Sequence, residues 1–100
     1  MITKRKITWT KSAIRQFNAT IEYIRLNSPQ NAENVKERIL QKVGMLADNT
    51  IVHRKDPYKK NNDGRYLYFE VLKCRIVYYA APEEVFIVRL RHTSMKPKSY

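Results

Sequence analysis

The last third of the chain contains three short runs of aromatic and β-branched residues, separated by very short breaks. The runs cover residues 65–71, 74–80 and 85–91. Such residues favour strands because their side chains pack well on a pleated, half-buried surface. Breaks this short force neighbouring strands to run antiparallel, since a parallel return needs about a dozen residues or more. The sequence therefore predicts a three-stranded antiparallel meander.

Two helices are predicted upstream of the meander, because apolar residues recur there at helical spacing. The first stripe consists of Ile14, Phe17, Ile21 and Ile24. It predicts a helix over 11–27, with Thr10 as its N-cap. The second stripe, which predicts a helix over 29–48, consists of Ala32, Val35, Ile39, Val43 and Leu46. The short break at Ser28-Pro29 suits a cap followed by a first helical residue, and it predicts an antiparallel helical hairpin.

The remaining segments complete the order of elements. Residues 2–9 alternate weakly, with Ile7 and Trp9 as apolar members, which predicts an edge strand. Residues 51–64 have no periodicity and predict a long loop that ends in turn-forming residues. The order is then β-α-α-β-β-β. We expect one α+β domain over residues 1–100, with a helical hairpin packed on one face of a mainly antiparallel four-stranded sheet.

Alternation along the strands predicts which side chains share a face. In the strand over 85–91, simple alternation separates Phe86, Val88 and Leu90 from Val85, Ile87, Arg89 and Arg91. In the strand over 65–71, it separates Arg65, Leu67 and Phe69 from Tyr66, Tyr68 and Glu70. The hairpin covers one face of the sheet only. We expect the other face to stay partly open and to present arginines beside tyrosines, a combination that provides phosphate pairing and stacking together.

The charge of the chain indicates an anionic partner. Twenty basic residues stand against nine acidic ones, which gives a net charge of +11. Such an excess disfavours compaction through self-repulsion and suits nucleic acid, an acidic protein or an anionic membrane. No apolar stretch approaches the ~18 residues of a membrane span, and no apolar core follows the basic residues at the start. We therefore expect neither membrane attachment nor a signal peptide.

Other classes of site have no signature in the sequence. The single cysteine, Cys74, excludes an internal disulfide framework, fits the reducing cytoplasm, and is interpreted as a buried strand residue. The two histidines, His53 and His92, have no cysteine or carboxylate at ligand spacing. With two glycines in the chain there is no glycine-rich phosphate loop, and no helix-turn-helix or zinc-finger pattern occurs. We expect no metal and no cofactor.

Several motifs resemble one family of bacterial proteins. Arg65 opens the meander, Cys74-Arg-Ile-Val-Tyr78 forms its middle strand, and Val88-Arg-Leu-Arg-His92 closes it. In this order, and from Trp9 to the tail, the chain resembles the toxins of RelE/ParE toxin–antitoxin modules, and its ending is most similar to ParE-type, plasmid-stabilisation members. The resemblance implies a cytoplasmic, growth-inhibiting toxin. It also implies a cognate acidic antitoxin whose disordered segment wraps the toxin and folds on binding.

The resemblance leaves the target open. A ParE-type toxin is not an enzyme; it binds DNA gyrase, and its basic face would be a docking surface. A RelE-type toxin is a ribosome-dependent mRNA endonuclease, in which a ribose 2′-OH attacks the adjacent phosphate with help from a base and from cations. A third alternative is a basic nucleic-acid-binding module without toxicity. The tail runs through Met95-Lys-Pro97 where RelE-type members have a dense basic stretch, which favours the ParE type.

Candidate site residues follow from these alternatives. In the RelE-type alternative, the resemblance makes Arg65 a phosphate-binding residue, Tyr100 a base-stacking residue and His92 a proton-transfer residue. For contacts with nucleic acid or a protein partner, the candidates are Lys59, Lys60, Arg65, Arg75, Arg89, Arg91, Lys96 and Lys98.

Overall fold

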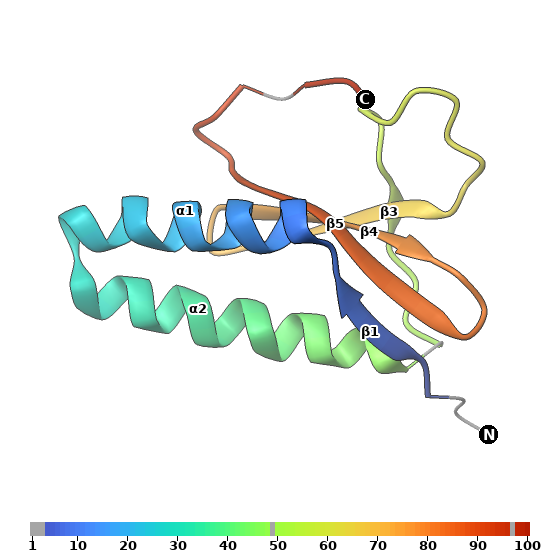
Figure 1. The fold of residues 1–100 in the computed structure, drawn as a ribbon, viewed down its shortest axis with the longest axis horizontal. Helices are drawn as coiled ribbons and strands as arrows, with labels where there is room; N and C mark the ends of the chain where they lie inside the picture. Colours follow the sequence, from blue (N-terminus) through green and yellow to red (C-terminus); the bar gives the residue numbers. More distant parts are fainter. Residues whose placement is uncertain (1–3, 49, 97) are drawn as a thin grey trace.

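The computed structural model describes residues 4–48, 50–96 and 98–100, which form a helical hairpin packed against a five-stranded sheet (Figure 1). The α+β class predicted from the sequence is confirmed. The elements in chain order are β1 (Lys6–Trp9), α1 (Lys11–Asn27), α2 (Pro29–Gly44), the 3₁₀ turn η1 (Met45–Ala47), β2 (Arg54–Lys55), β3 (Tyr66–Val71), β4 (Cys74–Ala80) and β5 (Glu84–His92). The part of the first predicted strand at residues 2 and 3 lies outside the described residues.

Side-chain caps set the start of both helices. The Thr10 hydroxyl accepts a hydrogen bond from the Ala13 N–H at 3.1 Å, and the Ser28 hydroxyl accepts one from the Asn31 N–H at 3.2 Å. Each bond satisfies one of the free N–H groups of a first helical turn. The first helix has the predicted bounds, whereas the second ends at Gly44 and continues as η1.

The sheet has one more strand than the sequence predicted. Its order is β1-β5-β4-β3-β2, with β1 parallel to β5 and all other pairs antiparallel. The additional strand is β2, which lies inside the predicted loop over 51–64 and pairs with β3. The predicted meander is present as β3, β4 and β5. Two residues join β3 to β4, and both Leu72 and Lys73 have positive φ, as a two-residue hairpin turn of type I′ requires.

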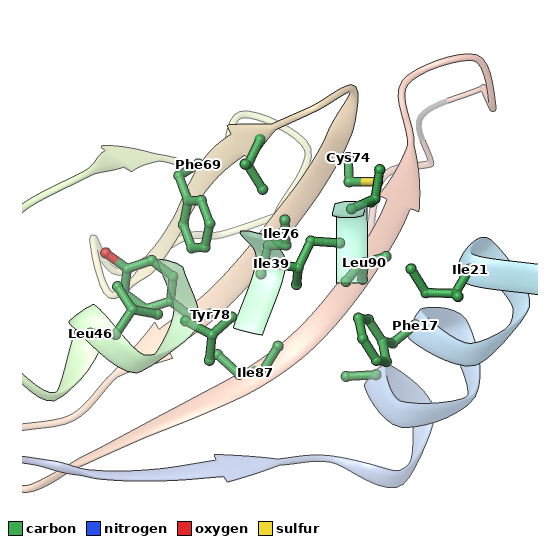
Figure 2. Packing of buried hydrophobic residues seen from close by; sticks show 14 of the residues in the cluster. Phe17, Ile21, Ile39, Leu46, Phe69, Cys74, Ile76, Tyr78, Ile87 and Leu90 are labelled. Atoms are coloured by element: carbon green, nitrogen blue, oxygen red, sulfur yellow. The ribbon is translucent and has the colours of Figure 1, made fainter. Parts of the chain in front are cut away.

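The core lies between the hairpin and one face of the sheet (Figure 2). All five members of the predicted second stripe are buried. The first stripe is only partly correct, because Ile14 is 44% exposed while Ala13 and Thr20 are buried. α1 therefore turns a slightly different side toward the sheet than its largest apolar residues indicate.

A β-bulge in β5 changes which side chains share a face. Val77 pairs with Arg89 and the next residue, Tyr78, pairs with Ile87, so Val88 is an extra residue in β5. The predicted simple alternation is therefore wrong beyond this point. Val85, Ile87 and Leu90 all face the core, and Arg89 and Arg91 are placed on the opposite face with Phe86. A bulge has this effect because side chains alternate with a period of two, and one inserted residue reverses them.

Candidate functional site

The centre of the sheet face away from the helices is occupied by Arg75, on β4. Its side chain is 9% exposed, and its guanidinium carbon lies 3.6 Å from the ring centroid of Tyr68. Its Nη2 lies 3.0 Å from Oδ1 of Asp56, and its Nη1 lies 3.7 Å from Glu70. Arg75 was a candidate for partner contacts, but its guanidinium is engaged inside the fold. It is therefore not part of the exposed contact surface.

Asp56 is the centre of a hydrogen-bond network on this face. It follows β2 directly and is 2% exposed. Besides Arg75, its carboxylate accepts hydrogen bonds from the Tyr58 N–H at 3.2 Å and from the Tyr100 hydroxyl at 2.6 Å. Burial acts to raise the pKa of Asp56, but the bonds from Tyr100 and Arg75 outweigh it and hold this pKa below its usual value. The carboxylate is thus kept ionised as an anchor for three groups.

The end of the chain returns to the loop that follows β2 (Figure 1). The Tyr100 N–H donates to the Tyr58 carbonyl at 2.9 Å, and the Lys60 N–H donates to the Tyr100 carbonyl oxygen at 2.5 Å. Burial, followed by the hydrogen bond to Asp56, raises the pKa of the Tyr100 phenol. Tyr100 is therefore a neutral donor that closes the network over the sheet.

Cations and aromatic rings alternate around Tyr100. The guanidinium carbon of Arg89 lies 4.2 Å from the Tyr100 ring centroid, and Nζ of Lys59 lies 5.4 Å from it. The Arg91 guanidinium lies 5.7 Å from the Tyr58 ring and donates to the Met95 carbonyl at 3.1 Å. Arg89, Arg91 and the two tyrosines line a small cavity of ≈ 40 Å³, together with Arg75 and Lys98. The structure thus brings together five of the eight candidate contact residues, namely Lys59, Arg75, Arg89, Arg91 and Lys98.

The other three contact candidates lie outside this cluster or at its rim. Arg65 and Lys96 are exposed and line no part of the cavity. Lys60 is exposed as well and contributes its backbone N–H to the bond with Tyr100. Their side chains remain accessible to a partner.

An aromatic row crosses the same face of the sheet. Tyr66 and Tyr79 have ring centroids 5.0 Å apart, and Tyr79 and Phe86 have centroids 6.4 Å apart. With Thr10 and Val88 they line an open hollow of ≈ 260 Å³. The face opposite the helices therefore combines half-buried rings with a cluster of cations, as the sequence predicted.

The three candidate catalytic residues do not converge. The carbonyl of Arg65 accepts a hydrogen bond from the N–H of Ala80, at one end of β4, whereas His92 pairs with Cys74 at the other end. Six residues of strand separate these positions, or about 20 Å at ~3.3 Å per residue. The His92 ring is hydrogen-bonded to Ser94 at 2.7 Å, and the Tyr100 hydroxyl is bound to Asp56. No single phosphate can contact all three side chains in this arrangement.

The described residues contain no group of three histidine, cysteine, aspartate or glutamate side chains that could hold a metal ion. Over the same part of the chain, no helix has both the length and the apolar character needed to cross a membrane.

Comparison with known proteins decides the family. The profile described as "ParE toxin of type II toxin-antitoxin system, parDE" matches residues 7–97. The chain belongs to the ParE toxin family. Membership in this family of toxin–antitoxin systems implies an antitoxin partner. No curated protein sequence matches the chain significantly.

A solved structure agrees with this ParE assignment at the level of the fold. That structure, described as "Chromosomal ParDE TA system from P. aeruginosa", superposes with a TM-score of 0.73 at 16% sequence identity. The alignment covers 90% of this chain and 97% of the other. At so low an identity the likeness concerns the arrangement of helices and strands.

Sequence reasoning did not single out Asp56 and Tyr58, two central members of the site in this ParE-family chain. One signal could have identified Asp56: it is the only acidic residue between Ile51 and Asn62, in a segment rich in lysine and arginine. A single carboxylate among cations is a natural ion-pair partner. What the sequence could not indicate is that its partner, Arg75, lies 19 residues further along the chain.

Proposed function

We propose that this ParE-family protein is the growth-inhibiting toxin of its pair, that it acts by binding DNA gyrase without catalysing a reaction, and that an acidic antitoxin neutralises it. The observation that carries the choice of a non-catalytic mechanism is the separation of Arg65 from His92 by about 20 Å of strand. A ribonuclease needs its phosphate-binding and proton-transfer groups within hydrogen-bond reach of one phosphate. The placement of these two residues supports a docking mechanism instead.

The charge and the open face support neutralisation by an acidic partner. The chain has a net charge of +11, and Lys60 and Arg65 are exposed in the segment between β2 and β3. A disordered acidic segment can neutralise such a surface and bury apolar area on the rings at the same time, which offsets its ordering cost. The binding should weaken as the salt concentration rises.

Expression of the protein and an assay of the purified protein test the proposed toxicity and the proposed target. The protein, produced alone from an inducible promoter, should arrest growth, and the purified protein should inhibit DNA supercoiling by gyrase. Cellular mRNA should remain intact in primer-extension assays. Unimpaired growth with soluble, folded protein would contradict the toxin proposal, and uninhibited supercoiling would contradict the choice of gyrase.

A second candidate, ribosome-dependent mRNA cleavage, is favoured by one observation. Arg89 and Lys59 lie against the ring of Tyr100, and a cation–aromatic cluster of this kind can bind a nucleotide. The Arg89→Ala variant separates the two candidates, because Arg89 belongs to this cluster. It should abolish cleavage if the protein is an endonuclease, and it should only weaken docking if the target is gyrase. Cuts at defined codon positions in mRNA would show that the protein is an endonuclease.

A further inference from the structure

We propose that the small cavity between Arg75, Arg89, Arg91 and Lys98 is a binding site for one phosphate dianion, either free phosphate or a terminal phosphate monoester. The site is distinct from the exposed cations Lys60, Arg65 and Lys96, and it does not depend on gyrase being the target. The cavity lies over β4 and β5, and its wall also includes Asp56 and Tyr100.

The lining of the cavity has an excess of positive charge. Four cationic side chains face one carboxylate, that of Asp56. Both oxygens of this carboxylate are already bound, one by Arg75 and one by the Tyr100 hydroxyl. Glu70 lies near Arg75 at 3.7 Å, but it is outside the cavity and half exposed. At least two positive charges therefore remain for a bound anion, which suits a dianion better than a single carboxylate group.

Arg75 provides the second and independent observation. Its side chain is more than nine-tenths buried, yet its Nε–H has no hydrogen-bond partner within the described residues. A buried donor without a partner is costly, and a charged one is more so. Arg75 lines the cavity but its Nε has almost no accessible surface, so a bound oxygen atom would satisfy this donor only after the guanidinium shifts toward it. A bound anion would then remove the free-energy cost of leaving this buried donor without a partner.

Arg89 also has N–H groups available to bind an anion. Its guanidinium carbon lies 4.2 Å from the Tyr100 ring centroid, a contact that restricts the movement of the group. Within the described part of the chain, Arg89 makes no side-chain hydrogen bond or ion pair. The cation–aromatic contact uses none of its N–H groups, and a guanidinium fork can bind phosphate oxygens in pairs.

The size of the cavity limits the ligand. A cavity of about 10–15 Å³ can hold one water molecule. This cavity, at ≈ 40 Å³, therefore has room for roughly three. This space is comparable with that of one phosphate group. An internal phosphodiester carries a single negative charge, and the nucleic-acid strand would have to continue on both sides of it. A free or terminal phosphate, with a charge close to −2 near neutral pH, fits the charge and the space better.

Titration with inorganic phosphate tests the proposal directly. Binding is measured by calorimetry and by ³¹P NMR line broadening at constant ionic strength, with chloride as the comparison salt. We expect saturable binding of phosphate and none of chloride. Arg89→Gln and Lys98→Gln should each weaken it by about tenfold, the equivalent of one lost charge-assisted hydrogen bond. Arg89→Lys keeps the charge but not the fork, and its loss should be smaller.

The control is Arg54→Gln, which removes one exposed positive charge on β2, outside the cavity. It should leave phosphate binding unchanged, and melting curves without phosphate establish that all variants fold. An equal loss in Arg54→Gln and Arg89→Gln would overturn the proposal, because binding would then reflect net charge alone. The absence of saturable binding to the folded wild-type protein would overturn it as well.

The source of the phosphate is distinguished with two oligonucleotides of one sequence, one with a 5′-phosphate and one with a 5′-hydroxyl. Tighter binding of the phosphorylated strand, lost in Arg89→Gln, identifies a strand end as the ligand. Equal binding of the two strands, together with saturable binding of inorganic phosphate, identifies the free anion.

Discussion

Asp56 and Arg75 form an ion pair with 3.0 Å between Oδ1 and Nη2, and their side chains are 1% and 9% exposed. The pair ties the segment after β2 to the central strand β4. Buried charges are stable only when they are paired, because the transfer of each from water is costly. The loop that carries part of the candidate site is therefore fixed to the sheet by this contact.

Replacement of Asp56 should destabilise the protein strongly. Asp56→Asn leaves the buried Arg75 charge without its main partner, and we expect the free energy of unfolding to fall by about 3 kcal/mol. Urea denaturation followed by circular dichroism measures the change. Glu37→Gln, on the exposed side of α2, is the matched control and should change stability by less than about 0.5 kcal/mol. Equal, small effects of the two variants would contradict a structural role for the pair.

The same carboxylate should make stability depend on pH in the acid range. The pKa of Asp56 is lower in the folded protein than its usual value of 3.8. Its stabilising contribution is therefore complete above that value and is lost as the pH falls through the lower, folded pKa. We expect the difference in unfolding free energy between wild type and Asp56→Asn to shrink steadily below about pH 4. Urea titrations of both proteins at several pH values measure it. A difference that stays constant on acidification would contradict this assignment.

Local signals predicted the helices and the meander well, because each depends on residues close together in the chain. The caps at Thr10 and Ser28 and the apolar stripe of α2 are readable from the sequence alone, and so is the short break at Leu72-Lys73. β2 could not be predicted in this way. It is two residues long, and only its pairing with β3 makes it a strand.

The candidate site was predicted less completely, for a related reason. The bulge at Val88 depends on the register between β4 and β5, which has no local signature, and it determines where Arg89 and Arg91 point. Sequence reasoning indicated the cations and tyrosines of the open face. It could not indicate that Arg75 is used internally by Asp56, since that contact joins distant segments.

Gln16 should stabilise β5 just beyond the bulge. Its Oε1 accepts a hydrogen bond from the Leu90 N–H at 2.8 Å, and Leu90 is 2% exposed. Gln16→Ala leaves this backbone donor without a partner, so we expect a loss of about 1–3 kcal/mol in the free energy of unfolding. Hydrogen exchange at Leu90 should accelerate as well. Asn18→Ala, an exposed position on the same helix, is the control and should leave both quantities nearly unchanged.

Cys74 should be chemically inert in the folded protein. The residue is fully buried at the start of β4, and burial raises the pKa of its thiol to about 11. Near pH 8 only about one thiol in a thousand would then be ionised, and the thiolate is the reactive form. We expect a chromogenic disulfide reagent to react with Cys74 only after denaturant is added. Because the chain has one cysteine, the signal has a single source. A native reaction rate close to that of the unfolded chain would show that β4 opens readily at this end of the sheet, and it would contradict the buried position of the thiol.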